Sequence, residues 1–236
     1  MIVDFPHFAH VHGWLLPRAL HMTSYLASNF VEPEAFNSIE IGVHHGKFFL
    51  GLENVTPKGG RALAFDVFSQ QDLNIDNSGM GNKGVFIEHV NKYAAHPERV
   101  EIFEQDSMDI DVASVGKSSF GLISIDGGHT KQHTINDLTI SQNLVTSQGI
   151  VILDDILNQD WTGVISGAIS FFSSPMAYRI VPFAIGFNKL FICHFSYADI
   201  LKKKLFDDEE ILKSFGVKPF KMTTFCDTEI VSLKGV

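Results

Sequence analysis

The sequence predicts an α/β fold of the Rossmann-like type, in which a mostly parallel sheet of seven strands carries helices on both faces. Two observations lead to this prediction. Short apolar runs recur along the 236 residues, and a segment with helical periodicity follows most of them. Near-continuous apolar runs are typical of strands that are buried on both faces. Regular alternation of strands and helices indicates βαβ units with right-handed crossovers.

Five apolar runs predict the parallel strands of this sheet. They are residues 38–42, 61–66, 100–106, 120–126 and 149–155. The segments between and after these runs place apolar side chains near helical spacing. These predicted helices are residues 45–53, 84–95, 131–145 and 161–172.

The later part of the chain predicts an antiparallel edge. Two apolar runs, residues 178–185 and 189–194, are separated by Gly-Phe-Asn. This pattern is typical of a β-hairpin. Residues 197–215 have the pattern of an amphipathic helix, and residues 219–233 could hold a last strand.

Length and composition favour one domain over residues 1–236. Apolar residues make up 45% of the chain, including 21 phenylalanines, so a sizeable core is available. We expect a cofactor-binding core at residues 38–194. Residues 1–36 would be an N-terminal helical addition, and residues 197–236 would add a C-terminal helix and strand.

Charge and hydropathy exclude several classes of partner. The net charge of −9 argues against a general nucleic-acid-binding protein, which needs a basic face for the phosphates. No stretch is apolar for long enough to span a bilayer, and no signal peptide is expected. Cys193 and Cys226 form no C-x-x-C pair, so reduced thiols in a cytoplasmic protein are the preferred interpretation.

Glycine and acidic residues follow the first two predicted strands, where ligands bind in open α/β sheets. Glu40, Gly42 and Gly46 form an E-x-G-x-x-x-G turn, in which Gly42 permits a tight turn and Gly46 permits close approach of a ligand. This is not the G-x-G-x-x-G fingerprint of dinucleotide-binding proteins. Asp66 closes the second strand and could accept hydrogen bonds from both hydroxyls of a ribose, although a solvent-facing aspartate is an equal alternative.

Polar residues also follow the third, fourth and fifth predicted strands. Asp106 and Ser107 could reach an adenine ring or could cap the next helix. Asp126 ends the fourth strand, and the pair Asp154-Asp155 ends the fifth, so three carboxylates can converge on one crevice. Such a cluster needs a cation, a proton or polar partners to compensate it. His129 could act there as a general base, or could be a surface residue.

Several other histidines have an irregular spacing. His7, His10, His12 and His21 lie among aromatic residues, and ordinary loop and helix positions are a simpler interpretation than a metal tract. For the pair His44-His45, in the glycine-containing turn, a polar lining role is preferred to metal ligation.

Together these motifs resemble class I S-adenosylmethionine-dependent methyltransferases, and within them the small-molecule O-methyltransferase branch that includes macrocin O-methyltransferase-like proteins. The resemblance covers residues 38–194. The matching segments are IEIGVHHGKF, ALAFDVF, EQDSMD, LISIDGGHTKQHTINDL and GIVILDDI. The linker between the second strand and its helix also looks family-like. It would place near the pocket Gln70, Asn74, Asp76, Ser78 and Gly79.

The resemblance implies a site for S-adenosylmethionine. Glu40, Gly42 and Gly46 would shape its methionine end, Asp66 would hold the ribose hydroxyls, and the pair Asp106-Ser107 would approach the adenine. The branch methylates small molecules, so a small-molecule or sugar hydroxyl is the expected acceptor. Terminal helices in the family often pack against a partner subunit, which makes a homo-oligomer an open alternative to a monomer.

The resemblance also implies a catalytic centre. Asp126, Asp154 and Asp155 match the positions that hold Mg²⁺ or another divalent cation in metal-dependent relatives. His129 matches the position of a catalytic base, with Asp126 beside it. One departure concerns the helix TKQHTINDL, which lacks the aromatic residue that relatives often have soon after the histidine.

Two other functions remain open at this point. The first is a nucleotide-binding oxidoreductase of the same fold, against which the missing G-x-G-x-x-G counts. The second is a non-catalytic cofactor-binding module, against which the concentration of acidic residues counts.

Overall fold

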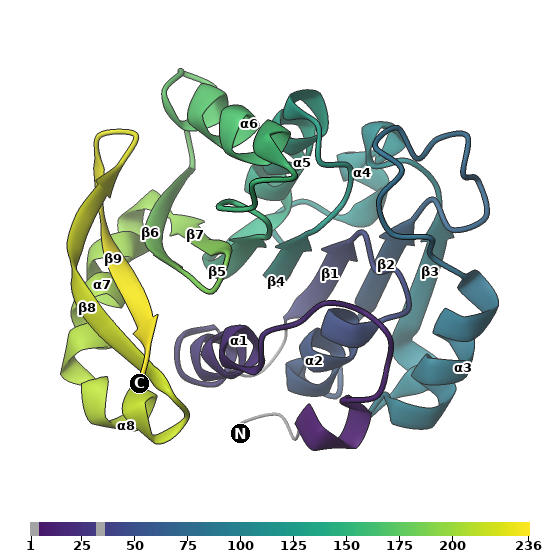
Figure 1. The fold of residues 1–236 in the computed structure, drawn as a ribbon, viewed down its shortest axis with the longest axis horizontal. Coiled ribbons are helices and arrows are strands. Elements are labelled where there is room, and N and C mark those ends of the chain that lie inside the picture. The colour runs from purple at the N-terminus through teal and green to yellow at the C-terminus, as the bar shows by residue number, and fades with distance from the viewer. Residues whose placement is uncertain (1–4, 32–35) are drawn as a thin grey trace.

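All strands of the described residues, 5–31 and 36–236, lie in a single sheet. In this computed structural model the strand order is β3-β2-β1-β4-β5-β7-β6-β9-β8 (Figure 1). The strands are β1 (Asn37–Ile41), β2 (Ala62–Asp66), β3 (Val100–Glu104), β4 (Phe120–Ile125), β5 (Val145–Leu153), β6 (Ile180–Gly186), β7 (Lys189–His194), β8 (Val217–Phe225) and β9 (Thr228–Gly235).

The first five strands are parallel neighbours, as the sequence predicted. In the central pairings Ile39 of β1 lies opposite Leu63 of β2 on one side and Ile123 of β4 on the other. The order reverses between β1 and β4, which is the point where open α/β sheets bind their ligands.

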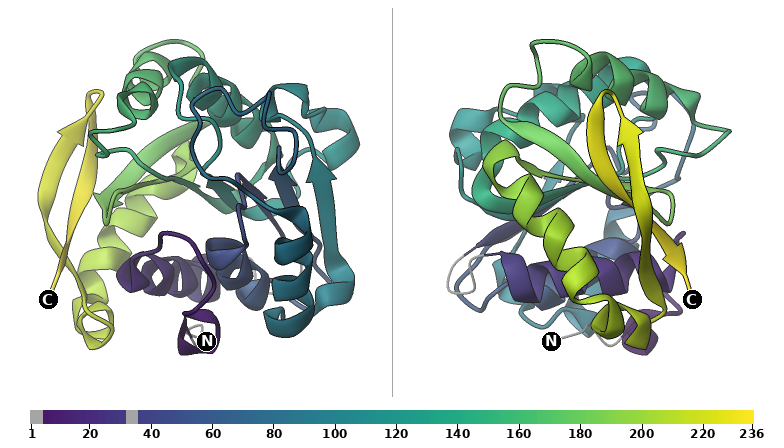
Figure 2. Two further views of the ribbon diagram at one scale, coloured as in Figure 1. Left: turned by 45° about the vertical axis from the view of Figure 1, so that its right-hand side comes forward. Right: turned by 90° about the vertical axis from the view of Figure 1, so that its left-hand side faces the viewer.

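Helices cover both faces of the sheet (Figures 1 and 2). The helices are α1 (Pro17–Phe30), α2 (Lys47–Val55), α3 (Lys83–Tyr93), α4 (Val112–Val115), α5 (Lys131–Leu144), α6 (Thr162–Phe172), α7 (Ala198–Asp207) and α8 (Glu209–Ser214). Short 3-10 helices are η1 (Phe5–Phe8), η2 (Pro97–Arg99), η3 (Ser107–Asp109) and η4 (Phe195–Tyr197). Because strand side chains alternate, Leu122 packs on the side of α1 and α2, and Ile123 packs on the side of α5 and α6.

Over the described residues the sheet has nine strands and not seven, because the C-terminal addition differs from its prediction. The β6–β7 hairpin is confirmed. The expected helix over residues 197–215 is divided at Asp208 into α7 and α8. In place of one last strand, β8 and β9 form a hairpin, and β9 extends the sheet by pairing with β6. The turn residues Cys226 and Asp227 both have positive φ, as a type I′ turn requires, but they lack the Asn-Gly signal.

The N-terminal addition packs against the C-terminal one. Within the predicted segment 1–36, α1 supplies the helix, while residues 1–4 and 32–35 lie outside the described part of the chain. The Tyr25 hydroxyl donates a 2.7 Å hydrogen bond to Asp208, and Arg18 reaches the carbonyl of Val236 at 3.3 Å. Among the described helices, none is both long enough and apolar enough to cross a membrane.

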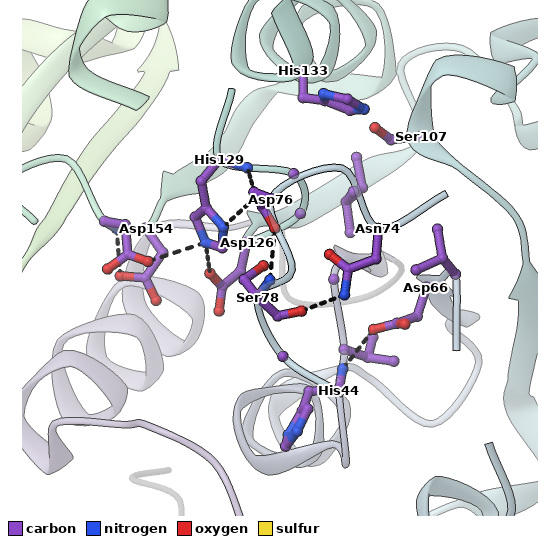
Figure 3. A pocket seen from close by; sticks show the side chains of 18 of the residues that line it. His44, Asp66, Asn74, Asp76, Ser78, Ser107, Asp126, His129, His133 and Asp154 are labelled. Atoms are coloured by element: carbon purple, nitrogen blue, oxygen red, sulfur yellow. Dashed lines mark hydrogen bonds and ion pairs between the residues drawn. The ribbon is translucent and has the colours of Figure 1, made fainter. Parts of the chain in front are cut away.

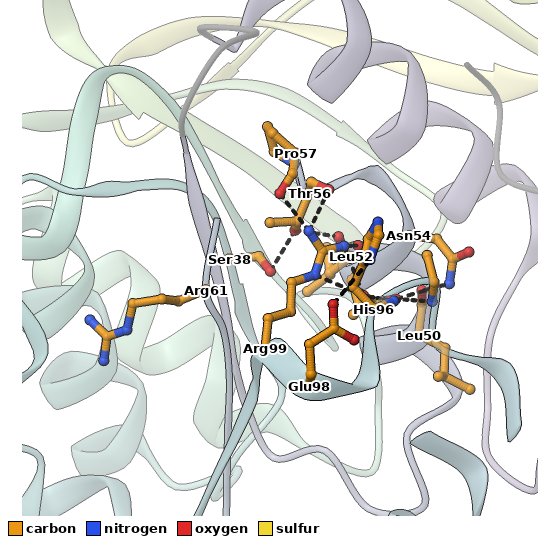
Figure 4. A network of polar contacts seen from close by, with 12 residues as sticks. Ser38, Leu50, Leu52, Asn54, Thr56, Pro57, Arg61, His96, Glu98 and Arg99 are labelled. Atoms are coloured by element: carbon orange, nitrogen blue, oxygen red, sulfur yellow. Dashed lines mark hydrogen bonds and ion pairs between the residues drawn. The ribbon is translucent and has the colours of Figure 1, made fainter. Parts of the chain in front are cut away.

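A buried ion pair fixes the end of α2 against the entry to β3 (Figure 4). Glu53 is fully buried, and Arg99 lies 2.7 Å from its carboxylate. The same carboxylate accepts hydrogen bonds from the backbone N–H groups of Ala95 (2.7 Å) and His96 (2.9 Å). The Arg99 guanidinium also donates to the carbonyl of Thr56 at 2.9 Å. Full hydrogen bonding of both charges is what makes such burial tolerable.

Replacement of Arg99 by alanine should therefore destabilise the protein by about 3–5 kcal/mol, because it leaves the Glu53 carboxylate buried without its counter-charge. Arg61→Ala is the matched control, since Arg61 pairs with Glu101 where both side chains are well exposed. That pair should contribute about 0–1 kcal/mol. Urea unfolding measures both values, and equal losses in the two variants would contradict the assignment.

Candidate active site

A cavity of about 560 Å³ lies at the carboxyl ends of the parallel strands (Figure 3). Its walls are the β1–α2 turn, the loop after β2 and the segments that follow β3, β4 and β5. This volume is within the range of about 300–1,000 Å³ that is usual for small-ligand sites. The predicted site residues that line it are Glu40, Gly42, Asp66, Asp106, Ser107, Asp126, His129, Asp154 and Asp155.

Glu40 and Gly42 form the floor of the β1–α2 turn. The buried Glu40 carboxyl accepts a 3.1 Å hydrogen bond from Ser124, while its Oε2 atom has no hydrogen-bond partner among the described residues. Burial, and then the nearby Asp126 carboxylate, raise the pKa of Glu40 well above its ordinary value. Gly42 has φ 85°, and a Cβ there would lie 1.9 Å from the carbonyl oxygen of Asp126. The turn can therefore lie against the end of β4 only because this residue is glycine.

Gly46 is not among the residues that line the cavity. It is the N-cap of α2 with φ 91°, and a Cβ there would lie 3.0 Å from the ring of Phe86 on α3. Its lack of a side chain thus serves the packing of α2 against α3.

Asp66 stands at the end of β2 with its carboxylate on the cavity wall. It accepts 2.7 Å hydrogen bonds from the backbone N–H groups of His44 and Phe68. Burial raises the pKa of Asp66, and these hydrogen bonds oppose the rise. Each carboxylate oxygen can accept a further hydrogen bond, so both remain able to bind hydroxyl groups in the cavity.

Asp106 caps the following short helix, which is one of the two roles that the sequence allowed, and it also lines the cavity. Its carboxylate caps η3 by accepting a 2.9 Å hydrogen bond from the N–H of Met108. Its Oδ1 atom also lies 3.4 Å from Nε2 of His133 on α5. Both Asp106 and the buried Ser107 line the cavity.

The loop between β2 and α3 folds across to the end of β4. Of its five residues predicted near the pocket, four line the cavity, namely Asn74, Asp76, Ser78 and Gly79, whereas Gln70 is exposed outside it. The Asp76 carboxylate accepts hydrogen bonds from the backbone N–H of His129 at 2.6 Å and from its ring Nδ1 at 2.9 Å. The sequence did not indicate this pairing, because 53 residues separate the two partners.

His129 lies among three carboxylates. Asp76 contacts the Nδ1 side of the ring. On the other side, the Nε2 atom lies 3.2 Å from the Asp155 carboxylate and 3.8 Å from the Asp126 carboxylate. Burial lowers the pKa of His129, but hydrogen bonds with Asp126, Asp155 and Asp76 outweigh it and raise the pKa to about 11. In the ligand-free protein His129 is therefore a cation at neutral pH and holds no free lone pair for a proton.

Trp161 supplies the aromatic group that the helix after His129 lacks. Its ring stacks on the His129 ring with centroids 4.5 Å apart and planes 18° from parallel. Trp161 is the N-cap of α6, so this aromatic partner of His129 comes from outside the helix that follows His129. A stacked ring both fixes the imidazole plane and favours its cationic form.

The three predicted metal ligands do not gather in one cluster. Asp154 turns to the buried Lys189 of β7 and forms an ion pair with it. The residues whose ligand atoms lie within 4.8 Å of one another are Asp126, His129 and Asp155. Charge compensation explains why Asp154 lies apart from Asp126 and Asp155. Lys189 forms an ion pair with Asp154, whereas His129 lies between the carboxylates of Asp126 and Asp155. The sequence did not indicate Lys189 as a site residue, because it is the first residue of an apolar strand, where a buried lysine is unusual.

The two carboxylates beside His129 differ in their surroundings. Burial and the Asp154 carboxylate raise the pKa of Asp126 to about 7, although His129 and Lys189 oppose the rise. Asp155 has φ 56° and accepts hydrogen bonds from the side-chain amides of Asn158 (2.9 Å) and Asn188 (2.6 Å). Despite its burial, hydrogen bonds with His129 and these amides lower its pKa. Asp155 thus stays ionised at pH values where Asp126 takes up a proton.

The charge state of His129 predicts how stability depends on pH. Because folding raises its pKa from 6.5 to about 11, the stabilisation is complete below pH 6.5 and is lost as the pH rises towards about 11. The free energy of unfolding of the wild type should fall across this window, and that of His129→Gln should fall less. Urea unfolding at several pH values tests this, with His96→Gln, at a histidine whose side chain is 32% exposed, as a control. Parallel curves for wild type and His129→Gln would refute the raised pKa.

Comparison with known proteins identifies the family. Residues 39–156, half of the chain, match the family described as "Methyltransferase domain". A comparison with curated protein sequences found no match. Similar solved structures include the O-methyltransferase NovP (TM-score 0.56, 13% identity, covering 75% of this chain and 80% of that one). A Klebsiella pneumoniae protein assigned as an O-methyltransferase has a TM-score of 0.55, with 17% identity over 81% of this chain and 86% of that one.

A further similar structure is cofactor-bound Rv0187 from MTB, with a TM-score of 0.54 and 14% identity over 72% of this chain and 78% of that one. At such identities these likenesses show the fold alone. The family match, which spans the strands and the turns that build the cavity, shows the activity class. The chain therefore belongs to the methyltransferase-domain family and is an S-adenosylmethionine-dependent methyltransferase.

Proposed function

We propose that this methyltransferase acts on a hydroxyl oxygen of a small molecule and that a divalent cation assists it. The observation behind the proposal is the cluster of Asp126, His129 and Asp155 on the wall of the cofactor cavity. Methylation of an oxygen requires loss of its proton, and this cluster holds the titratable groups that could control that proton. The names of NovP and of the Klebsiella protein agree with an oxygen acceptor.

The cavity residues fit the cofactor. S-adenosylmethionine supplies an activated methyl group on a sulfonium, so the protein must chiefly bind and orient the reactants. The unpartnered Oε2 of Glu40 is available to the amino group of the methionine part. Asp66 retains acceptor capacity for the ribose hydroxyls. Asp106 and Ser107 lie further along the same wall and are available to the adenine.

Asp126 and Asp155 would hold the cation. Mg²⁺ and similar hard cations prefer oxygen ligands, which the two carboxylates supply. The side-chain amide N–H groups of Asn158 and Asn188 donate to Asp155 and hold its carboxylate in place. Such a cation would lower the pKa of an acceptor hydroxyl. The predicted third ligand, Asp154, instead keeps the buried Lys189 neutralised. Since cation binding competes with the His129 proton for the same carboxylates, affinity should increase with pH.

His129 can accept a proton only after the negative charge around its ring decreases. As long as Asp76, Asp126 and Asp155 all surround it, the ring keeps its proton. In its neutral form it would stand between Asp76 on one nitrogen and the acceptor on the other, which is the arrangement of an oriented general base.

The mouth of the cavity favours an acceptor with an apolar part. Trp14 and Ile75 both line the cavity and are 78% and 66% exposed. Large exposed apolar side chains beside a polar site are typical of ligand-binding surfaces. We infer that the acceptor presents its hydroxyl on a body with an apolar face.

The cofactor assignment predicts micromolar binding of S-adenosylhomocysteine and a rise in the melting temperature. Asp66→Ala should weaken binding by about 1–3 kcal/mol, because it removes the acceptor for the ribose hydroxyls. Asp72→Ala, in the same loop region but exposed and outside the cavity lining, is the control. Calorimetric titration measures all three proteins. Absence of binding to the wild type would refute the cofactor site, and equal affinities would remove only Asp66 from it.

The metal assignment predicts that EDTA treatment lowers turnover and that added Mg²⁺ restores it. An acceptor is first identified by release of S-adenosylhomocysteine across a panel of hydroxyl compounds. Asp155→Asn should lose most of the Mg²⁺ response. In the wild type the response should strengthen as the pH rises, because loss of the His129 proton frees the Asp126 and Asp155 carboxylates for the ion. Full activity of the stripped wild type, without any Mg²⁺ response, would show that the cluster acts without a metal.

A further inference from the structure

A second cluster of potential ligands lies on the other side of the β1–α2 turn. His12 follows η1 near the N-terminus, while His44 and His45 belong to the turn itself. One nitrogen of each ring lies within 4.8 Å of the others. The ring centroids of His44 and His45 are 3.9 Å apart, and that of His12 is 5.3 Å from His44 and 5.6 Å from His45.

Two of these rings each have a buried nitrogen atom that forms no hydrogen bond among the described residues. The Nδ1 atoms of His44 and His45 are inaccessible to solvent and have no hydrogen-bond partner among the described residues. A buried polar atom without a partner costs roughly 1–3 kcal/mol. A bound ligand would remove this cost, whereas contacts among the three tilted rings alone would not.

The charge state of the rings suits a metal ligand. Burial, followed by the neighbouring histidines, lowers the pKa of His44 to about 4 and also lowers that of His45. Both rings are therefore neutral at neutral pH and offer lone pairs. Cation binding at this place would not first have to displace protons from them.

The two segments are already held together by other contacts. Lys47, in the first turn of α2, donates a 3.0 Å hydrogen bond to the carbonyl of Gly13. The ring of His89 on α3 donates from Nδ1 to the carbonyl of His45 at 2.8 Å. The Lys47 contact thus holds the segment that contains His12 against the turn without any ligand, and the His89 contact fixes the turn from the side of α3.

We propose that His12, His44 and His45 form a binding site for a divalent transition metal, with Zn²⁺ as the expected ion. Imidazole nitrogens suit Zn²⁺, Ni²⁺ and Cu²⁺, whereas Mg²⁺ and Ca²⁺ require oxygen ligands. Zn²⁺ binds histidine nitrogens at about 2.0–2.1 Å in tetrahedral geometry. Three protein ligands leave the fourth position open to water or to a ligand in the cavity, which His44 also lines.

The metal would join the N-terminal segment to the turn that shapes the cofactor site. His12 is exposed, which gives an ion a route from solvent, while the other two rings are half-buried. The sequence did not indicate this site, because His12 lies far from His44 and His45 along the chain and comes near them only in the folded protein.

The test is calorimetric titration of tag-free, EDTA-treated protein with ZnCl₂ in excess Mg²⁺, which occupies oxygen sites such as the Asp126–Asp155 cluster. The wild type should bind one Zn²⁺ that His12→Gln binds at least ten-fold more weakly. His96→Gln, at a partly exposed histidine outside the cluster, should bind as the wild type does. Circular dichroism of metal-free His12→Gln checks that the variant is folded. Equal affinity and stoichiometry in wild type and His12→Gln would overturn the proposal.

Electron paramagnetic resonance with Cu²⁺ identifies the ligand type directly. Coordination by the three rings should give hyperfine splitting from nitrogen nuclei, and His12→Gln should reduce the number of coupled nitrogens. His44→Gln provides a second variant with the same expectation. A spectrum of oxygen ligation alone, unchanged in both variants, would place the metal elsewhere and overturn the proposal.

Discussion

Compensation of negative charge at the carboxyl edge of the sheet is the constraint on which the site depends. The carboxyl groups of Glu40, Asp126, Asp154 and Asp155 lie close together there, and Lys189 and the imidazolium of His129 oppose their negative charge. Although burial lowers the pKa of Lys189, Asp154 and Asp126 raise it above its ordinary value. Each cation therefore stays charged because of the carboxylates, and the carboxylates tolerate burial because of the cations.

The antiparallel strand is what brings Lys189 to this edge. β7 pairs with β5 so that Leu190 lies opposite Leu153, which sets Lys189 beside Asp154 at the next position. Had β7 run parallel to β5, its first residue would lie at the opposite edge of the sheet. The antiparallel pairing of β7 with β5 thus supplies a positive charge to the site.

Parts of this arrangement were predictable from the sequence, and parts were not. Strand ends follow from local apolar runs, so Glu40, Asp66 and Asp126 could be placed on the cavity wall in advance. The counter-charge or hydrogen-bond donor of each carboxylate comes from a distant part of the chain, and the pattern of apolar residues does not show which part that is. The separation of Asp154 from Asp155, and the ninth strand after a Cys-Asp turn, both rest on backbone conformations with positive φ at residues other than glycine. Such residues carry no reliable local signal.

The β1–α2 turn connects the acidic cluster with the histidine cluster. On one side Gly42 touches the backbone of Asp126, whose side chain belongs to the acidic cluster. Two residues later, His44 donates its N–H to the ribose-binding candidate Asp66 and presents its ring to His12. A ligand on the histidines that fixes this turn would therefore also fix the Asp66 carboxylate. Linkage requires the effect to be reciprocal, so a bound cofactor would tighten metal binding by the same factor that the metal tightens cofactor binding.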